Sequence, residues 1–263
     1  MDYQLLQALH GDAGPQALIP QYINAGLGSL HQVKLRPSSV NQRRRSNIAV
    51  LSLAGTITQR STVLSRIFGG TSTEEFRQAL HAALVDRSVN HVVIDIDSPG
   101  GSVYGVDELA AEIYEARATK KVHAIANSLM ASAAYWIGSS ANDVSCTPSG
   151  EVGSIGVYGM HTDYSKFDAE AGIKTTLISA GRYKTEGNEF APLSTDARSA
   201  MQRRVDSYYS MMVKAIARNR GISQTAVRDR FGEGRVLGAR DALAVEMIDR
   251  IESLDEMLGR LAR

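Results

Sequence analysis

A serine and a lysine stand out as residues that could do covalent chemistry together. Ser132 lies in the run Asn127-Ser-Leu-Met-Ala-Ser-Ala-Ala-Tyr-Trp136, where an apolar strand gives way to an Ala-rich helix. Lys184 follows 52 residues later (184 − 132), in the loop segment Gly181-Arg-Tyr-Lys-Thr-Glu-Gly187. A serine hydroxyl attacks a carbonyl carbon only when a base takes its proton, and a neutral lysine amine can be that base. The pair predicts a serine hydrolase that uses lysine in place of histidine.

The neighbours of Ser132 favour a role as nucleophile. Ala131, Ala133 and Ala134 are small enough for a substrate chain to come close. At a helix start the Ala133 N–H has no intrahelical partner, so it could stabilise an oxyanion. The alternative is a serine that only caps the helix. Ser128 is a rival nucleophile, although Leu and Met follow it in place of small residues.

Lys184 needs a special environment to act as a base. Burial against apolar groups would lower its pKa toward neutrality. The flanking glycines, Gly181 and Gly187, permit a loop that turns the side chain inward. The alternative is a solvated loop lysine, which is the commoner fate of this residue type. The competing base is His161, 29 residues (161 − 132) after Ser132, because Ser–His sites are defined by space and not by sequence interval.

Two glycine-containing turns could complete such a site. Ser98-Pro-Gly-Gly-Ser102 ends a strand and opens a helix, and its glycines allow a sharp turn that leaves an amide N–H free to stabilise an oxyanion. Ser154, in Gly153-Ser-Ile-Gly-Val157, could hydrogen-bond to Lys184 and fix its side chain. Each turn also has a plainer interpretation, as a tight connection beside a strand.

The elements that must position these residues alternate along the chain. Strands followed by helices indicate parallel βαβ units, and near-continuous apolar runs fit a sheet covered on both faces. After residue 193 helices dominate. The patterns predict strands at 47–53, 91–96, 121–126, 143–146, 155–160 and 174–179, and helices at 73–86, 103–119, 131–140, 195–219, 222–231 and 239–245 and from 254.

The chain is expected to divide into an N-terminal arm and one domain. Residues 1–45 have weak periodicity and end in Arg43-Arg44-Arg45, which we interpret as a solvated linker at the end of a partly mobile arm. Residues 46–263 form the predicted domain that carries the Ser132–Lys184 pair. The helix at 195–219 carries an apolar stripe that must be buried against the sheet or another subunit. Its members are Met201, Val205, Tyr208, Tyr209, Met212 and Ile216.

Composition excludes several classes of protein. The net charge of +1 gives no argument for nucleic-acid binding, and the single cysteine, Cys146, fits a reducing compartment. The sequence has no signal-peptide pattern and no long apolar run, so we expect a cytoplasmic protein without a membrane anchor. It has no Cys/His cluster with metal-ligand spacing and no nucleotide-binding loop, so we expect no metal and no cofactor.

In their order, these motifs resemble the signal peptide peptidase A family of serine peptidases, whose catalytic dyad is Ser–Lys. The resemblance covers about 47–251 and implies an α/β fold of the Clp/crotonase type, a spiral of ββα units, with a helical C-terminal part and homo-oligomers. It implies Ser132 as nucleophile, Lys184 as base and Gly101, in Asp97-Ser-Pro-Gly-Gly101, as oxyanion donor beside Ala133. Ser154 would support the lysine. One departure is Ser132-Ala133-Ala134, where the family usually has a glycine.

The soluble head-maturation, or capsid assembly, proteases of tailed phages resemble the chain more closely. The resemblance lies in Ile48-Ala-Val-Leu-Ser-Leu-Ala-Gly-Thr56 and in 177–188. It implies scaffold, capsid or portal proteins as substrates, inside the prohead in the host cytoplasm. The alternatives are a bacterial cytoplasmic peptidase that degrades peptides and a non-catalytic oligomeric assembly protein. An acyl-CoA hydratase would need paired carboxylates near the oxyanion turn, and the sequence offers no convincing pair.

Overall fold

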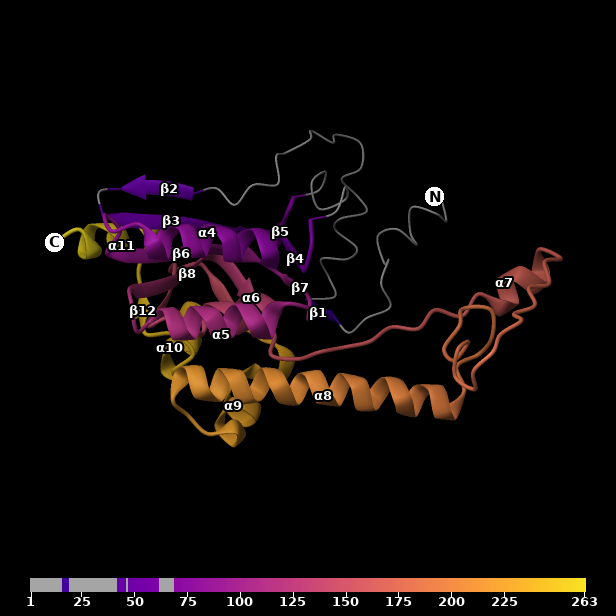
Figure 1. Ribbon diagram of the computed structural model, residues 1–263. Helices are drawn as coiled ribbons and strands as arrows, with labels where there is room; N and C mark the ends of the chain where they lie inside the picture. The colour runs from indigo at the N-terminus through magenta and orange to yellow at the C-terminus, as the bar shows by residue number, and fades with distance from the viewer. Residues whose placement is uncertain (1–15, 19–41, 46, 62–68) are drawn as a thin grey trace.

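The computed structural model describes residues 16–18, 42–45, 47–61 and 69–263. Within these residues the fold is built on an eight-stranded, mostly parallel sheet (Figure 1). Its order is β11-β10-β8-β6-β3-β2, and β9 pairs with both β8 and β12. The pairs β2–β3 and β10–β11 are antiparallel. The strands are β2 (Gln42–Arg45), β3 (Ile48–Ala54), β6 (His91–Ser98), β8 (Lys121–Ala131), β9 (Asp143–Cys146), β10 (Glu151–Gly153), β11 (Val236–Gly238) and β12 (Arg250–Ile251).

A smaller sheet of four strands lies at one end of the large one. Its order is β1-β7-β4-β5, and β1 pairs with β7 in antiparallel fashion. β7 follows β6 after the turn at Pro99, so the two sheets are joined through the glycine pair predicted to be functional. The strands are β1 (Gln16–Leu18), β4 (Thr56–Thr58), β5 (Gly70–Ser72) and β7 (Gly100–Ser102).

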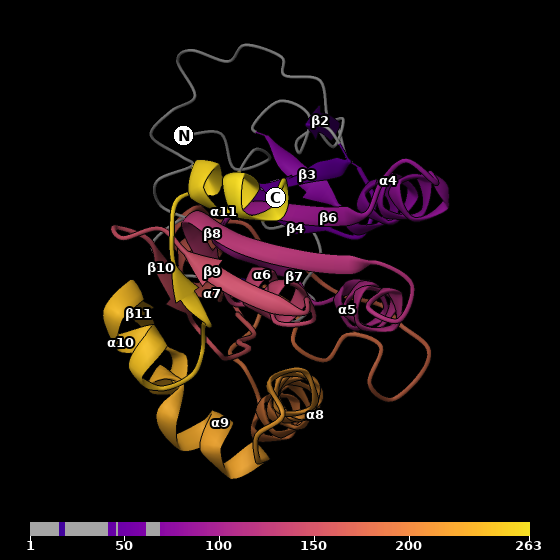
Figure 2. The same cartoon turned by 90° about the vertical axis from the view of Figure 1, so that its left-hand side faces the viewer.

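Helices cover both faces of the large sheet (Figure 2). Neighbouring strand residues point to opposite faces, so Leu51 and Ile94 join the main core while Val50 and Val93 face the other side. The main core is completed by α4 (Thr73–Val85), α5 (Val106–Ala116), α6 (Ala133–Gly138) and α8 (Thr195–Arg220). The C-terminal helix α11 (Leu254–Leu261) covers the other face.

The helical C-terminal part agrees with the sequence prediction. Ser194 caps α8 by accepting a hydrogen bond from the Ala197 N–H, and Gly221 ends the helix in a left-handed conformation with φ 67°. Of the predicted apolar stripe, Met212 and Ile216 are fully buried. The remaining helices here are α9 (Gln224–Arg230) and α10 (Ala239–Ala244).

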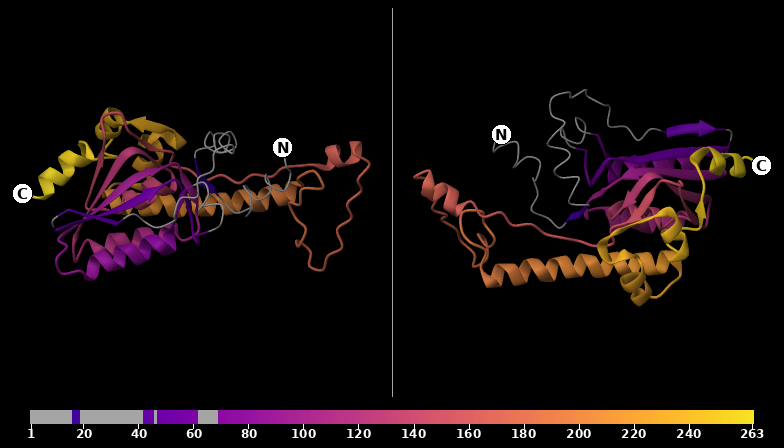
Figure 3. Two further views of the ribbon diagram at one scale, coloured as in Figure 1. Left: turned by 90° about the horizontal axis from the view of Figure 1, so that it is seen from above. Right: turned by 180° about the vertical axis from the view of Figure 1, so that it is seen from behind.

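Residues 157–193 project from the core in the views of Figures 1 and 3, and we call them the projecting segment. They contain the short helix α7 (Ser165–Glu170). The outgoing and returning limbs contact each other, since the Tyr164 N–H donates to the Glu189 carbonyl at 2.8 Å. The N-terminal half of α8 carries this segment away from the core. The segment therefore has little of its surface covered by its own chain.

Two predicted strands are wrong, for different physical reasons. The strand expected at 155–160 is replaced by β10, which ends at Gly153 (φ 134°), and Ser154 (φ 53°) then turns the chain out of the sheet. The run 174–179 has strand-forming residues but lies exposed on the projecting segment. A strand needs a neighbour for its ladder of hydrogen bonds, and this run has none within the described residues.

The strand and helix beside Ser132 also differ from the prediction. β8 continues to Ala131, five residues beyond the predicted end (131 − 126), because Leu129–Ala131 pair with β10. The helix that follows starts at Ala133 and ends at Gly138, so it is shorter than predicted. Ser132 therefore stands directly at the carboxyl end of a central strand.

Two pieces of the predicted N-terminal arm are described, and both pair with strands of the core. Gln16–Leu18 are β1, and Gln42–Arg45, which include the arginine run interpreted as a linker, are the edge strand β2. The interpretation of that run as a linker is thus wrong. The rest of the arm lies outside the described residues, so the domain boundary at residue 45 stays a prediction.

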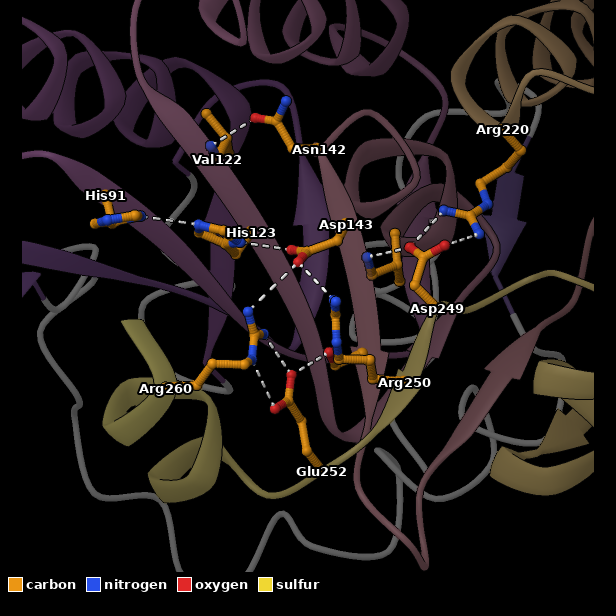
Figure 4. A network of polar contacts seen from close by, with 12 residues as sticks. His91, Val122, His123, Asn142, Asp143, Arg220, Asp249, Arg250, Glu252 and Arg260 are labelled. Atoms are coloured by element: carbon orange, nitrogen blue, oxygen red, sulfur yellow. Dashed lines mark hydrogen bonds and ion pairs between the residues drawn. The ribbon is translucent and has the colours of Figure 1, made fainter. Parts of the chain in front are cut away.

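A network of charged side chains links the amino-terminal ends of β6, β8 and β9 (Figure 4). His123 donates from Nδ1 to Asp143 Oδ1 at 2.5 Å, and its Nε2 lies 3.1 Å from His91 Nδ1. Arg250 and Arg260 approach the other carboxylate oxygen of Asp143, at 3.0 Å and 3.7 Å. Because Arg260 belongs to α11, the network fastens that helix to the sheet.

Candidate active site

Ser132 occupies a strained turn between β8 and α6. Its backbone has φ 55° and ψ −119°, a conformation that residues other than glycine rarely adopt. The turn is held because the Ser132 N–H donates to the Gly153 carbonyl at 2.7 Å and its carbonyl accepts from the Trp136 N–H at 3.0 Å. A sharp, strained strand-to-helix turn can point a serine hydroxyl toward a substrate, which is how a nucleophilic serine is held.

The Ser132 hydroxyl does not cap the helix. It makes no capping hydrogen bond, although Ser132 is the N-cap residue of α6. Its one described contact is a long one, in which Oγ donates to the Gly156 carbonyl at 3.4 Å. The interpretation of this serine as a simple helix cap is therefore wrong. The side chain is fully buried in the single chain.

The predicted rival, Ser128, is engaged elsewhere. It lies within β8, is exposed, and its hydroxyl donates to Asp97 Oδ1 at 2.9 Å. The register between β6 and β8 shifts at this point, because Ile96 pairs with Ala126 but Ser98 pairs with Met130. A step of two residues in β6 therefore matches a step of four in β8, and Ser128 lies within the longer step. Because its hydroxyl is already engaged with Asp97, Ser128 is the weaker nucleophile.

Both glycines of the predicted oxyanion turn are required by the backbone itself. Gly100 has φ 97°, which favours glycine, and its N–H donates to Ser98 Oγ at 3.1 Å. A Cβ on Gly101 would lie 2.0 Å from the Ile57 carbonyl oxygen, because β4 passes directly over it. The Gly101 and Ala133 N–H groups as oxyanion donors stay predictions, but α6, which starts at Ala133, packs against β7.

Ser154 lies beside Ser132 in the structure, whereas its expected role beside Lys184 stays a prediction. Gly153 pairs with Ala131 in the β10–β8 ladder, so the residues that follow each strand are neighbours. Ser154 has φ 53°, is buried, and its N–H donates to the Arg235 carbonyl at 2.8 Å. The positive φ angles of both serines were not predicted, because no sequence pattern marks a non-glycine residue in that conformation.

Lys184 is not brought to Ser132 within this single chain. It is exposed and lies on the projecting segment, in a turn closed by its own N–H and the Gly181 carbonyl at 3.1 Å. The predicted inward-facing lysine loop is therefore absent from the described chain. The competing base, His161, is on the same segment, and its Nε2–H donates to the Asn188 carbonyl at 2.9 Å.

The part of the chain that the structure describes holds no group of three or more His, Cys, Asp or Glu side chains arranged to bind a metal ion. None of its helices is long and apolar enough to cross a membrane. Cys146 is buried, and burial raises the pKa of its thiol to about 12. The thiol is therefore not a competing nucleophile.

Comparison with known proteins places these features in context. Residues 115–263 match the sequence model of Peptidase family S49. The chain is 34% identical over 229 residues to the head-tail preconnector protein GP5 of Enterobacteria phage P21, covering 86% of this chain and 45% of that protein. It is 31% identical over 206 residues to capsid assembly protease C of Escherichia phage lambda, covering 78% and 46%. The chain thus spans about half the length of these relatives.

The fold is also similar to that of a solved structure. A mutant ClpP1 from Listeria monocytogenes superposes with a TM-score of 0.51 at 15% identity, covering 80% of this chain and 94% of that one. The α/β fold of the Clp/crotonase type, which the family resemblance implied, is confirmed by this likeness.

Proposed function

The chain belongs to peptidase family S49, and on this premise we propose that it is a serine endopeptidase with Ser132 as nucleophile and Lys184 as general base. The observation that carries the proposal is Ser132 itself: a buried serine, held at φ 55° between a central strand and a helix, whose hydroxyl caps nothing. Residues in such rarely populated backbone conformations cluster at active sites.

The proposed reaction follows from the groups around Ser132. Its oxygen attacks the carbonyl carbon of a peptide bond while the neutral Lys184 amine takes the hydroxyl proton. The N–H groups of Gly101 and Ala133 stabilise the oxyanion, and the Lys184 ammonium then gives its proton to the leaving amine. Water releases the acyl group from Ser132 by the same steps, and Ser154 orients the lysine.

Lys184 would act on the Ser132 of a neighbouring copy. Two observations support this arrangement. Lys184 is exposed on a segment that points away from its own core, whereas a lysine base must be desolvated to be neutral. The same segment exposes a set of large apolar side chains that one chain leaves uncovered. They are Met160, Phe167, Ile173, Leu177, Ile178 and Tyr183.

We propose proteins of a phage head as the natural substrates. The support is the similarity to two phage proteins, one named a capsid assembly protease and the other a head-tail preconnector protein. Scaffold, capsid and portal proteins are the expected substrates, and the host cytoplasm, inside the prohead, is the expected place of action. A bacterial peptidase that degrades peptides is the alternative enzyme, and a non-catalytic assembly protein is the alternative from another class.

Mixing two inactive variants tests both the dyad and its division between copies. Ser132→Ala and Lys184→Ala should each lose turnover of an unfolded protein substrate. A mixture, dissociated and reassembled, should recover about a quarter of the wild-type rate, because random neighbours restore one site in four. His161→Ala, on the same segment, is the matched control and should keep most activity. Activity retained by Ser132→Ala would overturn the nucleophile, and a mixture that stays inactive would overturn the sharing between copies.

A further inference from the structure

The strand β7 has one edge that is filled only by a short piece of the chain's own N-terminal region. On one side β7 pairs with β4, where Ile57 lies opposite Gly101. On the other side it pairs with β1, which is the last strand of the small sheet. Without β1 this side would present unpaired N–H and C=O groups, the feature that extended peptides bind by adding a strand.

The same edge adjoins the proposed catalytic groups. β7 contains Gly101, and α6, which begins directly after Ser132, packs against β7. In the antiparallel ladder Ala17 lies opposite Gly101, with Gln16 and Leu18 opposite the two residues beside it. Ser132 and Gly101 are both buried in this chain. A substrate cannot reach them until part of the chain moves away.

The sequence around β1 suits a strand that binds and leaves. It reads Gly14-Pro-Gln-Ala-Leu-Ile-Pro20. Proline has no N–H to give to a ladder, so neither Pro15 nor Pro20, on the two sides of β1, can donate a hydrogen bond to β7. A strand this short contributes few hydrogen bonds and can be displaced by a longer peptide.

We propose that the segment around Ala17 is a built-in competitor for substrate: β1 occupies the edge of β7 on which an extended peptide binds, and it must leave before turnover. The inference rests on the proposed peptidase function and adds a regulatory element to it. Substrate affinity would be reduced by the fraction of chains in which β1 is seated.

Two proline substitutions test the competition. Successive N–H groups of a strand point to opposite sides, so either Ala17→Pro or Leu18→Pro removes a hydrogen bond to β7. That variant should lower the KM for a short peptide roughly fivefold, the equivalent of one backbone hydrogen bond, and should leave kcat unchanged. Ala17→Val, which keeps the N–H, is the matched control. A free peptide with the sequence of residues 14–20 should raise the lowered KM again by competition.

Amide hydrogen exchange gives a readout that does not need activity. The amides of Gly100–Ser102 should exchange faster in the variant with the lowered KM, and thermal melting should show that the core remains folded. Unchanged KM and unchanged exchange in both proline variants would overturn the inference while leaving the peptidase proposal intact. Faster exchange without any change in KM would also overturn it, because β1 would then be only structural. If neither the wild type nor any variant hydrolyses peptide, and a serine-directed covalent probe fails to label Ser132, the peptidase proposal itself is overturned.

Discussion

The two ends of the large sheet are built on opposite principles. At the amino-terminal ends of β6, β8 and β9, His91, His123 and Asp143 form a chain of polar contacts that α11 completes with Arg260. At the carboxyl end of β8, Ser132 is strained and its hydroxyl has only one long contact. Polar groups that satisfy one another stabilise a fold, whereas strained and poorly satisfied groups are available for chemistry. The comparison indicates which end should respond in stability and which in activity.

The carboxyl end should give the largest effect on activity and a small one on stability. Ser132→Ala should reduce turnover roughly 10³-fold or more. It should leave the melting temperature near that of wild type, because its hydroxyl contributes no strong hydrogen bond. Peptide hydrolysis and thermal melting measure the two. Ser128→Ala is the matched control, and loss of turnover there with activity kept in Ser132→Ala would reverse the assignment.

Gly101→Ala should lower both activity and stability, because Gly101 is a proposed oxyanion donor and also packs against β4. It therefore breaks the rule that the carboxyl end affects activity alone. The added Cβ would lie 2.0 Å from the Ile57 carbonyl oxygen, so β7 or β4 must shift, and we expect a loss of about 2–4 kcal/mol in the free energy of unfolding. Gly156→Ala is the control, since nothing lies within 4 Å of its added Cβ. Urea unfolding measures both variants. Equal stability for the two would show that β4 does not hold β7 in place.

Asp143→Asn should affect stability alone. The carboxylate accepts from His123 and pairs with Arg250 and Arg260, and the pKa of Asp143 is lowered by the His123 hydrogen bond and these charges despite its burial. Its loss should cost about 1–3 kcal/mol in urea unfolding. It should leave kcat unchanged.

An exposed ion pair provides the control for that substitution. Glu74→Gln breaks the pair with Arg60, and because both side chains are exposed it should cost less than about 0.5 kcal/mol. A large fall in kcat for Asp143→Asn, with stability retained, would show that the two ends are coupled.

Acidification should weaken the amino-terminal end first. Burial, and then the neighbouring His123, lower the pKa of His91 from its ordinary 6.5. Lys121 and Arg260 also face it with positive charge, and Asp143 opposes them. The neutral form is thus favoured in the folded chain. The stability that neutral His91 contributes is complete above about pH 6.5. It is lost as the pH falls through the lowered pKa of His91 in the folded chain.

The size of this pH effect is small because His91 is partly exposed. Solvent screening should keep the loss on going from pH 7.5 to 5.5 to about 1 kcal/mol or less. His91→Gln should flatten the dependence. Urea unfolding at the two pH values is the measurement. An unchanged slope in His91→Gln would assign the pH dependence to other groups.

Periodicity in the sequence predicted the parts of the fold that depend on local signals. The helices expected at 73–86 and 195–219 form close to these bounds, and each begins at a serine, Ser72 or Ser194, whose side chain accepts a hydrogen bond from an N–H three residues along. What failed depended on distant partners: β8 extends past residue 126 only because β10 pairs with it.

The candidate site shows the same limit. Ser132 could be selected from its small neighbours, but its left-handed φ depends on the Gly153 carbonyl 21 residues away (153 − 132). The position of Lys184 could not be predicted. The sequence of a glycine-containing loop does not show whether the loop folds back onto its own domain or projects away from it. The pairing of β1 with β7 was likewise missed, since three residues carry no periodicity.

The length of α8 limits which insertions and deletions this protein can accept in evolution. The helix has 26 residues, and its C-terminal half packs on the core while its N-terminal end extends beyond it, as a rigid strut for the projecting segment. Each inserted residue would lengthen that strut by about 1.5 Å and rotate its far end by about 100°. Loops beyond the strut can gain or lose single residues at little cost. The strut itself tolerates insertion or deletion only in steps close to whole turns, because any other step would point Lys184 in a new direction.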